Sequence, residues 1–503
     1  MGSGQDSIEK GRDAAYHEGK RENGAGMLSA GEILLLNQLL YCPKEEDEKR
    51  TIHAYQGNTI GVLLNRWSAE PLPDEAECGL CMKGKEWNHI VRLIAENPDL
   101  RRMMIQSVHW DEAAGGWGGM SVVFTGRCLR EAVVVFRGTA AGEWRDDFLG
   151  GAATGERDGV STTQQRNALE WYRSLGLSGH FSRITVSGHS KGGNKAKYIA
   201  LMEDSVTRCV SFDGQGFSDE FIEKYRDRIC VRQQVIENHN MEYDYVNILL
   251  NDVGKKFYYQ GFADKRRGIL RMHCINAFFW FGEGDSCFLV RGEKEEEGKM
   301  QVLDRFLNSC LRSLSREKKI DMTEFLGAMA ELELGAESEE PFVIEDDQKD
   351  SSGKKNRQNA MVSLLLQGKN LDLTAYLLAY LMEYQRTVPE WMDSIEQVSE
   401  KFGLRGLKLL TQIAKGMSEW NDLEIWIKGI GILMDAAPNW MWERLQSLCE
   451  ERCGWGISDG DLRLLAGIVN RAAEMGKNIS VRPGTGEDLN YCKSSLQGTG
   501  QGR

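Results

Sequence analysis

Between residues 121 and 237, short runs of apolar and β-branched residues alternate with segments of helical pattern. SVVFTG and EAVVVFRGT have the character of two strands paired around a short turn at Gly126 and Arg127. The segments that follow are, in order, a helix (VSTTQQRNALEWYRSLGL), a strand (RITVSG), a helix (KGGNKAKYIALMED), a strand (TRCVSF), a helix (DEFIEKYRDRI) and a strand (CVRQQVIE). This alternation predicts an α/β fold with a mostly parallel sheet covered by helices on both faces.

A chain of 503 residues is too long for one ordinary hydrophobic core, so we expect more than one domain. The β pattern stops near residue 293, and helices with an apolar face lie further on, as in LDLTAYLLAYLMEY, where Leu373, Leu377, Tyr380 and Tyr384 share one side. The predicted segments are a disordered polar tail (1–26), an α/β domain (27–292), connecting helices (293–335), a charged linker (336–358), an all-α C-terminal bundle (359–477) and a flexible tail (478–503).

The formal net charge of -13 argues against a surface that binds nucleic acid, because phosphate contacts need clustered lysine and arginine. No apolar run approaches the roughly 20 residues needed to span a bilayer, and the N-terminal stretch has no secretory signal pattern. The cysteines, among them Cys209 and Cys230, are scattered as buried free thiols are, so we expect a cytoplasmic protein. The single CxxC, Cys78 to Cys81, lacks two further zinc ligands, and we expect no metal and no cofactor.

The pattern Gly-x-Ser-x-Gly occurs twice, around Ser190 in GHSKG and around Ser458 in GISDG. A nucleophile elbow needs an apolar strand before the serine, a helix after it, and glycines on both sides because the turn brings backbones into contact. Ser190 has the strand RITVSG, the following helix, and Gly188 and Gly192. Ser458 follows no strand and has the character of a helix N-cap. We therefore expect Ser190, and not Ser458, to be a nucleophile.

Lys191 follows this serine in the first turn of a helix, where a positive charge is unfavourable by about 0.3–1 kcal/mol. In a nucleophile elbow, the backbone N–H of the residue after the serine points into the oxyanion hole. We therefore expect Lys191 to act through its amide, with its side chain in solvent.

A serine nucleophile needs a base, and only His239 and His273 follow Ser190 in the chain. In α/β-hydrolases the acid lies between the serine and the histidine. His239 stands at the end of CVRQQVIE with little room for an acid before it, whereas His273 follows a further strand-like segment, KKFYYQGF, so we favour His273. Asp213 and Asp244 each follow a predicted strand, and either carboxylate suits the task of orienting the imidazole.

With these motifs the sequence resembles class 3 lipases and, more closely, the bacterial Mbeg-like branch of lipase-like α/β-hydrolases. Four motifs carry the resemblance over about residues 27–290: VVVFRGT with Trp144 and Asp147 downstream, the elbow GHSKGGN, FDGQGF with Gln215 in place of a proline, and the Asp-Tyr-Val that begins at Asp244. The resemblance implies that Asp244 is the acid, with Asp213 as the alternative, and that His273 is the triad histidine. It also implies that Thr139 of FRGT is an oxyanion donor beside Lys191.

Together these features predict a serine acyl hydrolase, esterase or lipase-like, that cleaves an ester or thioester through an acyl-enzyme. The expected partner is a small-molecule or lipid acyl substrate, with no nucleic acid and no transmembrane segment. Two alternatives stay open. One is a catalytically latent hydrolase-fold protein that binds a protein partner through its helical C-terminal domain, and the other is a serine peptidase on the same fold.

Overall fold

The computed structural model of the chain describes residues 27–41, 51–78, 82–110, 119–126, 130–139, 160–259, 273–279, 298–315, 317–322 and 370–401, with isolated residues and pairs between 324 and 479. The described residues form two compact units, one that ends at Met300 and one that begins at Gln301. The predicted tails at 1–26 and 478–503 and the predicted linker at 336–358 lie outside the described residues, apart from Ile479.

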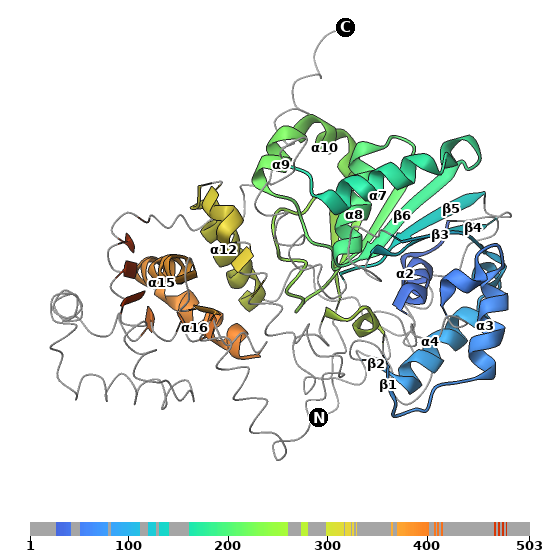
Figure 1. The fold of residues 1–503 in the computed structure, drawn as a ribbon, viewed down its shortest axis with the longest axis horizontal. Helices are drawn as coiled ribbons and strands as arrows, with labels where there is room; N and C mark the ends of the chain where they lie inside the picture. Colours follow the sequence, from blue (N-terminus) through green and yellow to red (C-terminus); the bar gives the residue numbers. More distant parts are fainter. Residues whose placement is uncertain are drawn as a thin grey trace, which may run out of the picture. The chain divides into compact units, whose positions relative to one another are not determined.

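A seven-stranded sheet organises the first unit, and its strands lie side by side in sequence order (Figure 1). Its strands are β3 (Met104–His109), β4 (Ser121–Gly126), β5 (Glu131–Phe136), β6 (Arg183–His189), β7 (Arg208–Phe212), β8 (Ile236–Met241) and β9 (Lys255–Tyr259). β3, β4 and β5 pair antiparallel, and β5 to β9 are parallel to one another. The predicted α/β class and mostly parallel sheet are therefore confirmed, and so is the hairpin of β4 and β5. A separate two-stranded sheet pairs β1 (Glu77–Cys78) with β2 (Met82–Lys83).

Helices cover both faces of the large sheet (Figure 1). Along β5, Val133 and Val135 belong to one buried cluster, and Ala132, Val134 and Phe136 belong to the other, as the alternation of side chains along a strand requires. The helices of the first cluster are α2 (Ala30–Gln38), α3 (Ile60–Ala69), α4 (Gly84–Glu96) and α5 (Pro98–Arg102), with the 3-10 turns η1 (Leu39–Tyr41), η2 (Ile52–Tyr55) and η8 (Ile275–Phe278). Those of the second are α7 (Thr163–Ser174), α8 (Lys191–Met202), α9 (Asp219–Lys224) and α10 (Arg226–Arg232), with η5 (Leu177–Gly179). The short turn η6 (Gln233–Val235) leads from α10 into β8.

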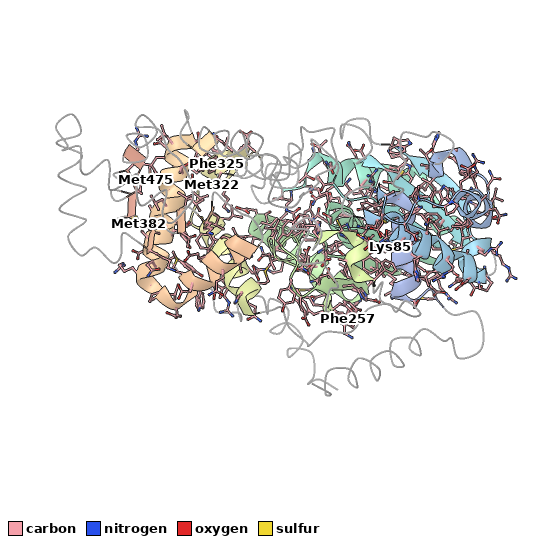
Figure 2. The ribbon with its side chains drawn as sticks, turned by 90° about the horizontal axis from the view of Figure 1, so that it is seen from below. Lys85, Phe257, Met322, Phe325, Met382 and Met475 are labelled. Carbon is pink, nitrogen blue, oxygen red and sulfur yellow. The ribbon has the colours of Figure 1, made fainter. Side chains whose placement is uncertain are left out.

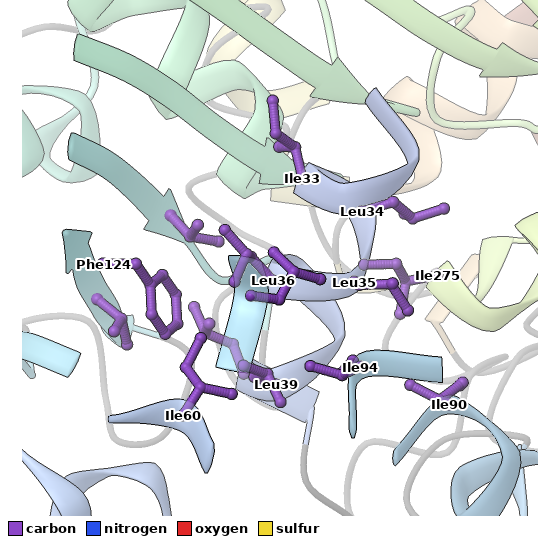
Figure 3. Close-up of a cluster of buried hydrophobic side chains, with 14 of the residues drawn as sticks. Ile33, Leu34, Leu35, Leu36, Leu39, Ile60, Ile90, Ile94, Phe124 and Ile275 are labelled. Carbon is purple, nitrogen blue, oxygen red and sulfur yellow. The ribbon is translucent and has the colours of Figure 1, made fainter. Parts of the chain in front are cut away.

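The N-terminal helix α2 is buried at the centre of its cluster. Figure 3 shows its side chains among Phe124 of β4, Ile90 and Ile94 of α4, and Ile275. Ser29 begins the helix with a capping box, since its hydroxyl and the carboxylate of Glu32 each bond to the other residue's backbone N–H. Because α2 is fixed at its start and packed along its length, the residues of η1 at its end are held in place beneath the carboxyl edge of the sheet.

One predicted strand is wrong. CVRQQVIE does not form a strand over its whole length, because Cys230 to Arg232 end α10 and β8 begins only at Ile236. The guanidinium of Arg232 donates to the carbonyl of Ala200 in the last turn of α8 and to those of Glu203 and Val206 just after it, so a tertiary contact holds this segment in the helix. The expected free thiol at Cys230 is also wrong, because Cys230 is disulfide-bonded.

The second unit is helical and contains α12 (Gly298–Arg312) from Gln301 onward, α15 (Asn370–Thr387) and α16 (Pro389–Lys401). The predicted apolar face of α15 is buried, and its Tyr384 packs edge-on against Phe306 of α12 with ring centroids 5.2 Å apart. Met322 and Phe325 are buried in the same unit (Figure 2). The helix α12, expected only as a connection, is thus part of this helical unit. Within the described residues, no helix has both the length and the hydrophobicity that crossing a membrane requires.

Candidate active site

The carboxyl ends of the parallel strands bring most of the predicted site residues to one edge of the sheet. Thr139 follows β5, Ser190 follows β6, Asp213 follows β7 and Asp244 follows β8. Ligand sites of open α/β sheets lie at this edge, because the loops of successive parallel strands meet there. His273 comes after β9 in the sequence, and its ring centroid lies 4.7 Å from that of His189, the residue before Ser190.

Ser190 occupies a sharp turn between β6 and α8. Its φ of 59° and ψ of -127° lie in a region that non-glycine residues avoid, at a cost of about 1–3 kcal/mol. Its N–H donates to the carbonyl of Phe212 on the next strand, 2.9 Å away, which helps to hold the turn. The side chain is 5% exposed. A strand, a strained serine and a helix in this order are the geometry of a nucleophile elbow.

The glycines on either side of Ser190 are required by close backbone contacts. A Cβ added at Gly188 would lie 2.2 Å from the carbonyl carbon of Gly192, and one added at Gly192 would lie 2.0 Å from the carbonyl oxygen of Phe136. Neither space can hold a methyl group without movement of the backbone. The close approach expected from the sequence is therefore present at both positions.

Gly192→Ala should destabilise the protein by more than about 3 kcal/mol, because its new Cβ meets backbone and not a side chain that can turn away. The measurement is the urea midpoint of unfolding for the variant and the unchanged protein. Gly179→Ala is the matched control, since a Cβ there meets nothing within 4 Å. Equal midpoints for the two variants would contradict the close packing of this turn.

The structure brings His273 and Asp244 together. Nδ1 of His273 lies 2.5 Å from Oδ2 of Asp244, and both side chains are buried. The other carboxylate oxygen, Oδ1, accepts hydrogen bonds from the backbone N–H groups of Val246 and Asn247. Nε2 of His273 is buried and has no hydrogen-bond partner among the described residues. An imidazole held at Nδ1 by a carboxylate, with Nε2 unpaired, is arranged as the base of a triad is.

Asp213, the alternative acid, has a different set of partners. Its Oδ1 accepts from the backbone N–H of Met241 at 2.7 Å and from the side-chain amide of Asn247 at 2.9 Å. Its Oδ2 is buried and has no hydrogen-bond partner among the described residues. Asn247 therefore joins the two acids, through its backbone N–H to Asp244 and through its side chain to Asp213.

Burial is the largest cause of the pKa shifts of Asp213, Asp244 and His273, because a charge on any of these groups would have little solvent around it. Burial raises the pKa of Asp244 to about 8, and hydrogen bonds from the backbone amides of Asn247, Val246 and Tyr245 act in the opposite direction. Burial and the nearby Asp244 raise the pKa of Asp213 well above its ordinary value. Burial lowers the pKa of His273 to about 3, so its imidazole carries no net charge near neutral pH.

The side chain of His239 bonds to other groups, although its carbonyl accepts from the N–H of Asp213. His239 lies within β8, where Nδ1 bonds to the hydroxyl of Tyr259 at 2.7 Å and the ring stacks on that of Phe257, with centroids 5.0 Å apart. These contacts pack the imidazole of His239 against side chains of the neighbouring strand, β9.

Lys191 begins α8, and the expectation that its side chain is solvated is wrong, because the residue is 1% exposed. The reason is the position of α8, whose residues from Lys191 to Leu201 are all buried, so the helix has no face open to water. Lys197 is buried in the same way and forms an ion pair with Asp252, with Nζ 2.6 Å from Oδ1. Thr139, the other predicted oxyanion donor, is half-buried and directly follows the buried Gly138.

Two residues near the elbow were not singled out from the sequence. The hydroxyl of Tyr41, at the end of η1, accepts from the N–H of Gly138 at 2.9 Å and bonds to Nδ1 of His189 at 3.1 Å. Nε2 of His189 bonds to the carbonyl oxygen of His273 at 2.8 Å. His189 was visible in GHSKG, but nothing in the sequence marked Tyr41, which lies 148 positions from its histidine partner.

Within the described residues, His189, Asp213 and His273 form the group whose side chains could hold a metal ion, with ligand atoms all within 4.8 Å of one another. Both nitrogens of His189 are already used, one by Tyr41 and the other by the His273 carbonyl. A metal ion would have to break one of these bonds, so the group does not form a prepared metal site. Trp144, Asp147, Cys81 and Ser458 lie outside the described residues.

The fold and the site define a mixed α/β protein with a serine on a strained strand-to-helix turn beside a paired histidine and aspartate. A sequence family described as Mbeg1-like matches residues 120–253, which agrees with the Mbeg-like resemblance within that segment. The match includes Thr139, Ser190, Asp213 and Asp244 but not His273. No curated protein matches the chain.

Proposed function

We propose that the protein is a serine acyl hydrolase with an α/β-hydrolase fold, which cleaves an ester or thioester through an acyl-enzyme. The observation that carries this proposal is the strained turn at Ser190, at the same edge of the sheet as the imidazole of His273 held by Asp244. The order serine, acid, histidine along the chain is that of α/β-hydrolases. The role of His273 as a base is supported by its Nε2, which has no hydrogen-bond partner among the described residues while Nδ1 is held by Asp244.

In this mechanism the hydroxyl of Ser190 attacks the acyl carbonyl while Nε2 of His273 accepts its proton. Asp244 holds the ring through Nδ1 and stabilises the imidazolium that forms. The backbone amides of Thr139 and Lys191 bind the oxyanion of the tetrahedral intermediate. His273 then returns the proton to the departing alcohol or thiol. Water, activated by the same imidazole, releases the acid from Ser190.

The test is reaction of the purified full-length protein with a fluorophosphonate probe, followed by peptide mapping of the labelled residue. Labelling at Ser190 is expected. A panel of p-nitrophenyl esters and acyl thioesters of graded chain length, with a peptide amide included, then identifies the substrate class. Absence of both labelling and turnover would overturn the proposal and favour a latent hydrolase fold that acts through the helical unit. Cleavage of the peptide amide in preference to the esters would favour a peptidase.

A further inference from the structure

The hydrogen bonds of Tyr41 connect three separate parts of the candidate site. The Tyr41 hydroxyl bonds to Gly138, before the proposed oxyanion residue Thr139, and to His189, before the proposed nucleophile. His189 in turn bonds to the backbone carbonyl of His273. Gly138 is tightly packed at this point: a Cβ added there would lie 2.7 Å from the Tyr41 hydroxyl, 2.8 Å from the His189 carbonyl oxygen and 3.1 Å from Cβ of Ser190.

The direction of each hydrogen bond follows from the chemistry of the groups. The carbonyl of His273 can only accept, so Nε2 of His189 must carry a hydrogen. Burial and the neighbouring His273 lower the pKa of His189 well below its ordinary value, so the ring is neutral and its Nδ1 is an acceptor. The Tyr41 hydroxyl therefore donates to Nδ1 of His189 and accepts from the N–H of Gly138, and one tautomer of His189 is fixed.

The position of Tyr41 is itself fixed by the core. The side-chain amide of Asn37 on α2 donates to the hydroxyl of Ser187 on β6 at 2.9 Å, and α2 packs near Ile275, two residues after His273 (Figure 3). The guanidinium carbon of Arg137 lies 5.3 Å from the centroid of the Tyr41 ring. Movement of the hydroxyl is therefore restricted by elements on both sides of the elbow.

We infer that Tyr41 is a positioning residue for the proposed hydrolysis. Its hydroxyl, acting through His189, sets the backbone of His273 and the 138–139 segment relative to Ser190. This inference rests on the proposed function, because it assigns Tyr41 no contact with substrate. It predicts that loss of the hydroxyl slows the chemical step and leaves substrate binding nearly unchanged.

The test is a double-mutant cycle of Tyr41→Phe and His189→Gln, read by kcat, KM and the rate of fluorophosphonate labelling. Phenylalanine keeps the ring and its packing but removes the hydroxyl. Glutamine can place its NH₂ group at the position of Nε2, as a donor for the His273 carbonyl, but it has no acceptor atom at the position of Nδ1. Each single variant should lower kcat and the labelling rate by about 10- to 100-fold, with KM changed less than about twofold. The double variant should lose little more than the larger single loss, because both changes break the same link.

Tyr172→Phe is the control, since it removes a hydroxyl that bonds to Ser205, beyond the C-terminal end of α8, whereas Ser190 lies at its N-terminal end. It should keep the activity of the unchanged protein. Labelling of Ser190 at the original rate in Tyr41→Phe, or additive losses in the cycle, would overturn the inference and leave the proposed function standing. No labelling of the unchanged protein would overturn both. If Tyr41→Phe fails to fold, the kcat and labelling rate of His189→Gln test the inference, because this variant removes the other partner of the hydrogen bond between Tyr41 and His189.

Discussion

Ser190→Ala is expected to abolish covalent labelling by a fluorophosphonate and to lower ester turnover by about 10⁶-fold. The change removes the hydroxyl that would attack the acyl carbon, and alanine leaves the backbone of the turn and the pairing of His273 with Asp244 in place. The measurements are gel fluorescence of the labelled protein, turnover of the best ester of the panel, and a melting curve that shows the variant is folded.

Ser458→Ala is the matched control, since this serine stands in the second Gly-x-Ser-x-Gly pattern of the chain. It should label and turn over as the unchanged protein does. Undiminished labelling of a folded Ser190→Ala variant would mean that the nucleophile is another residue. Loss of labelling in both variants would mean that the probe reports something other than a single elbow serine.

Asp244→Asn should lower kcat by about 10⁴-fold while the protein stays folded. The amide oxygen of asparagine can still accept from Val246 and Asn247, but its NH₂ group then faces Nδ1 of His273. That contact makes Nδ1 an acceptor and moves the ring hydrogen to Nε2, so the imidazole can no longer take a proton from Ser190. The loss should appear in kcat, and KM should change little.

Asp213→Asn provides the comparison within the same cluster. Neither carboxylate oxygen of Asp213 bonds to an imidazole among the described residues, and asparagine has nearly the same shape as aspartate. Its oxygen can still accept from Met241 and Asn247. The variant should keep most of the activity and its melting temperature. If folded Asp213→Asn loses turnover and folded Asp244→Asn keeps it, the acid of the triad is Asp213.

The strands that the sequence predicted well are those with a strong local signal. β5 and β6 are apolar runs bounded by glycine and polar residues, and their patterns alone indicate buried strands. β8 is different, because Asn238, His239 and Asn240 are unusual in a strand interior. They are accommodated there by contacts that local sequence does not contain, such as the bond from the Asn238 side chain to the carbonyl of Val253.

The candidate site also contains residues that a local sequence pattern predicted and residues whose position depends on tertiary packing. Ser190 was predicted because a nucleophile elbow is a local pattern, and His273 because it follows a further strand-like segment. Asp213 and Asp244 both fitted the order of the chain, and only the family resemblance favoured Asp244. Their roles stay predictions, but the 2.5 Å contact between Asp244 and His273 is a geometric fact that sequence could not supply. Lys191 was expected in solvent because it is charged, whereas its exposure is set by the layers around α8. No sequence pattern indicated Tyr41, because its contacts with Gly138 and His189 depend on how α2 packs against the sheet.

The sequence order of the strands has a consequence for how the protein matures during synthesis. Each strand of the large sheet pairs with those next to it in the chain, so the sheet can grow by one strand at a time as the chain leaves the ribosome. Tyr41 and the segment after β5 emerge first, the serine turn forms once β6 and α8 have docked, and His273 arrives after β9. A nascent chain that ends at β8 therefore has Ser190, the proposed nucleophile, but not His273, the proposed base. Reactivity toward acyl groups would begin only when the sheet is complete.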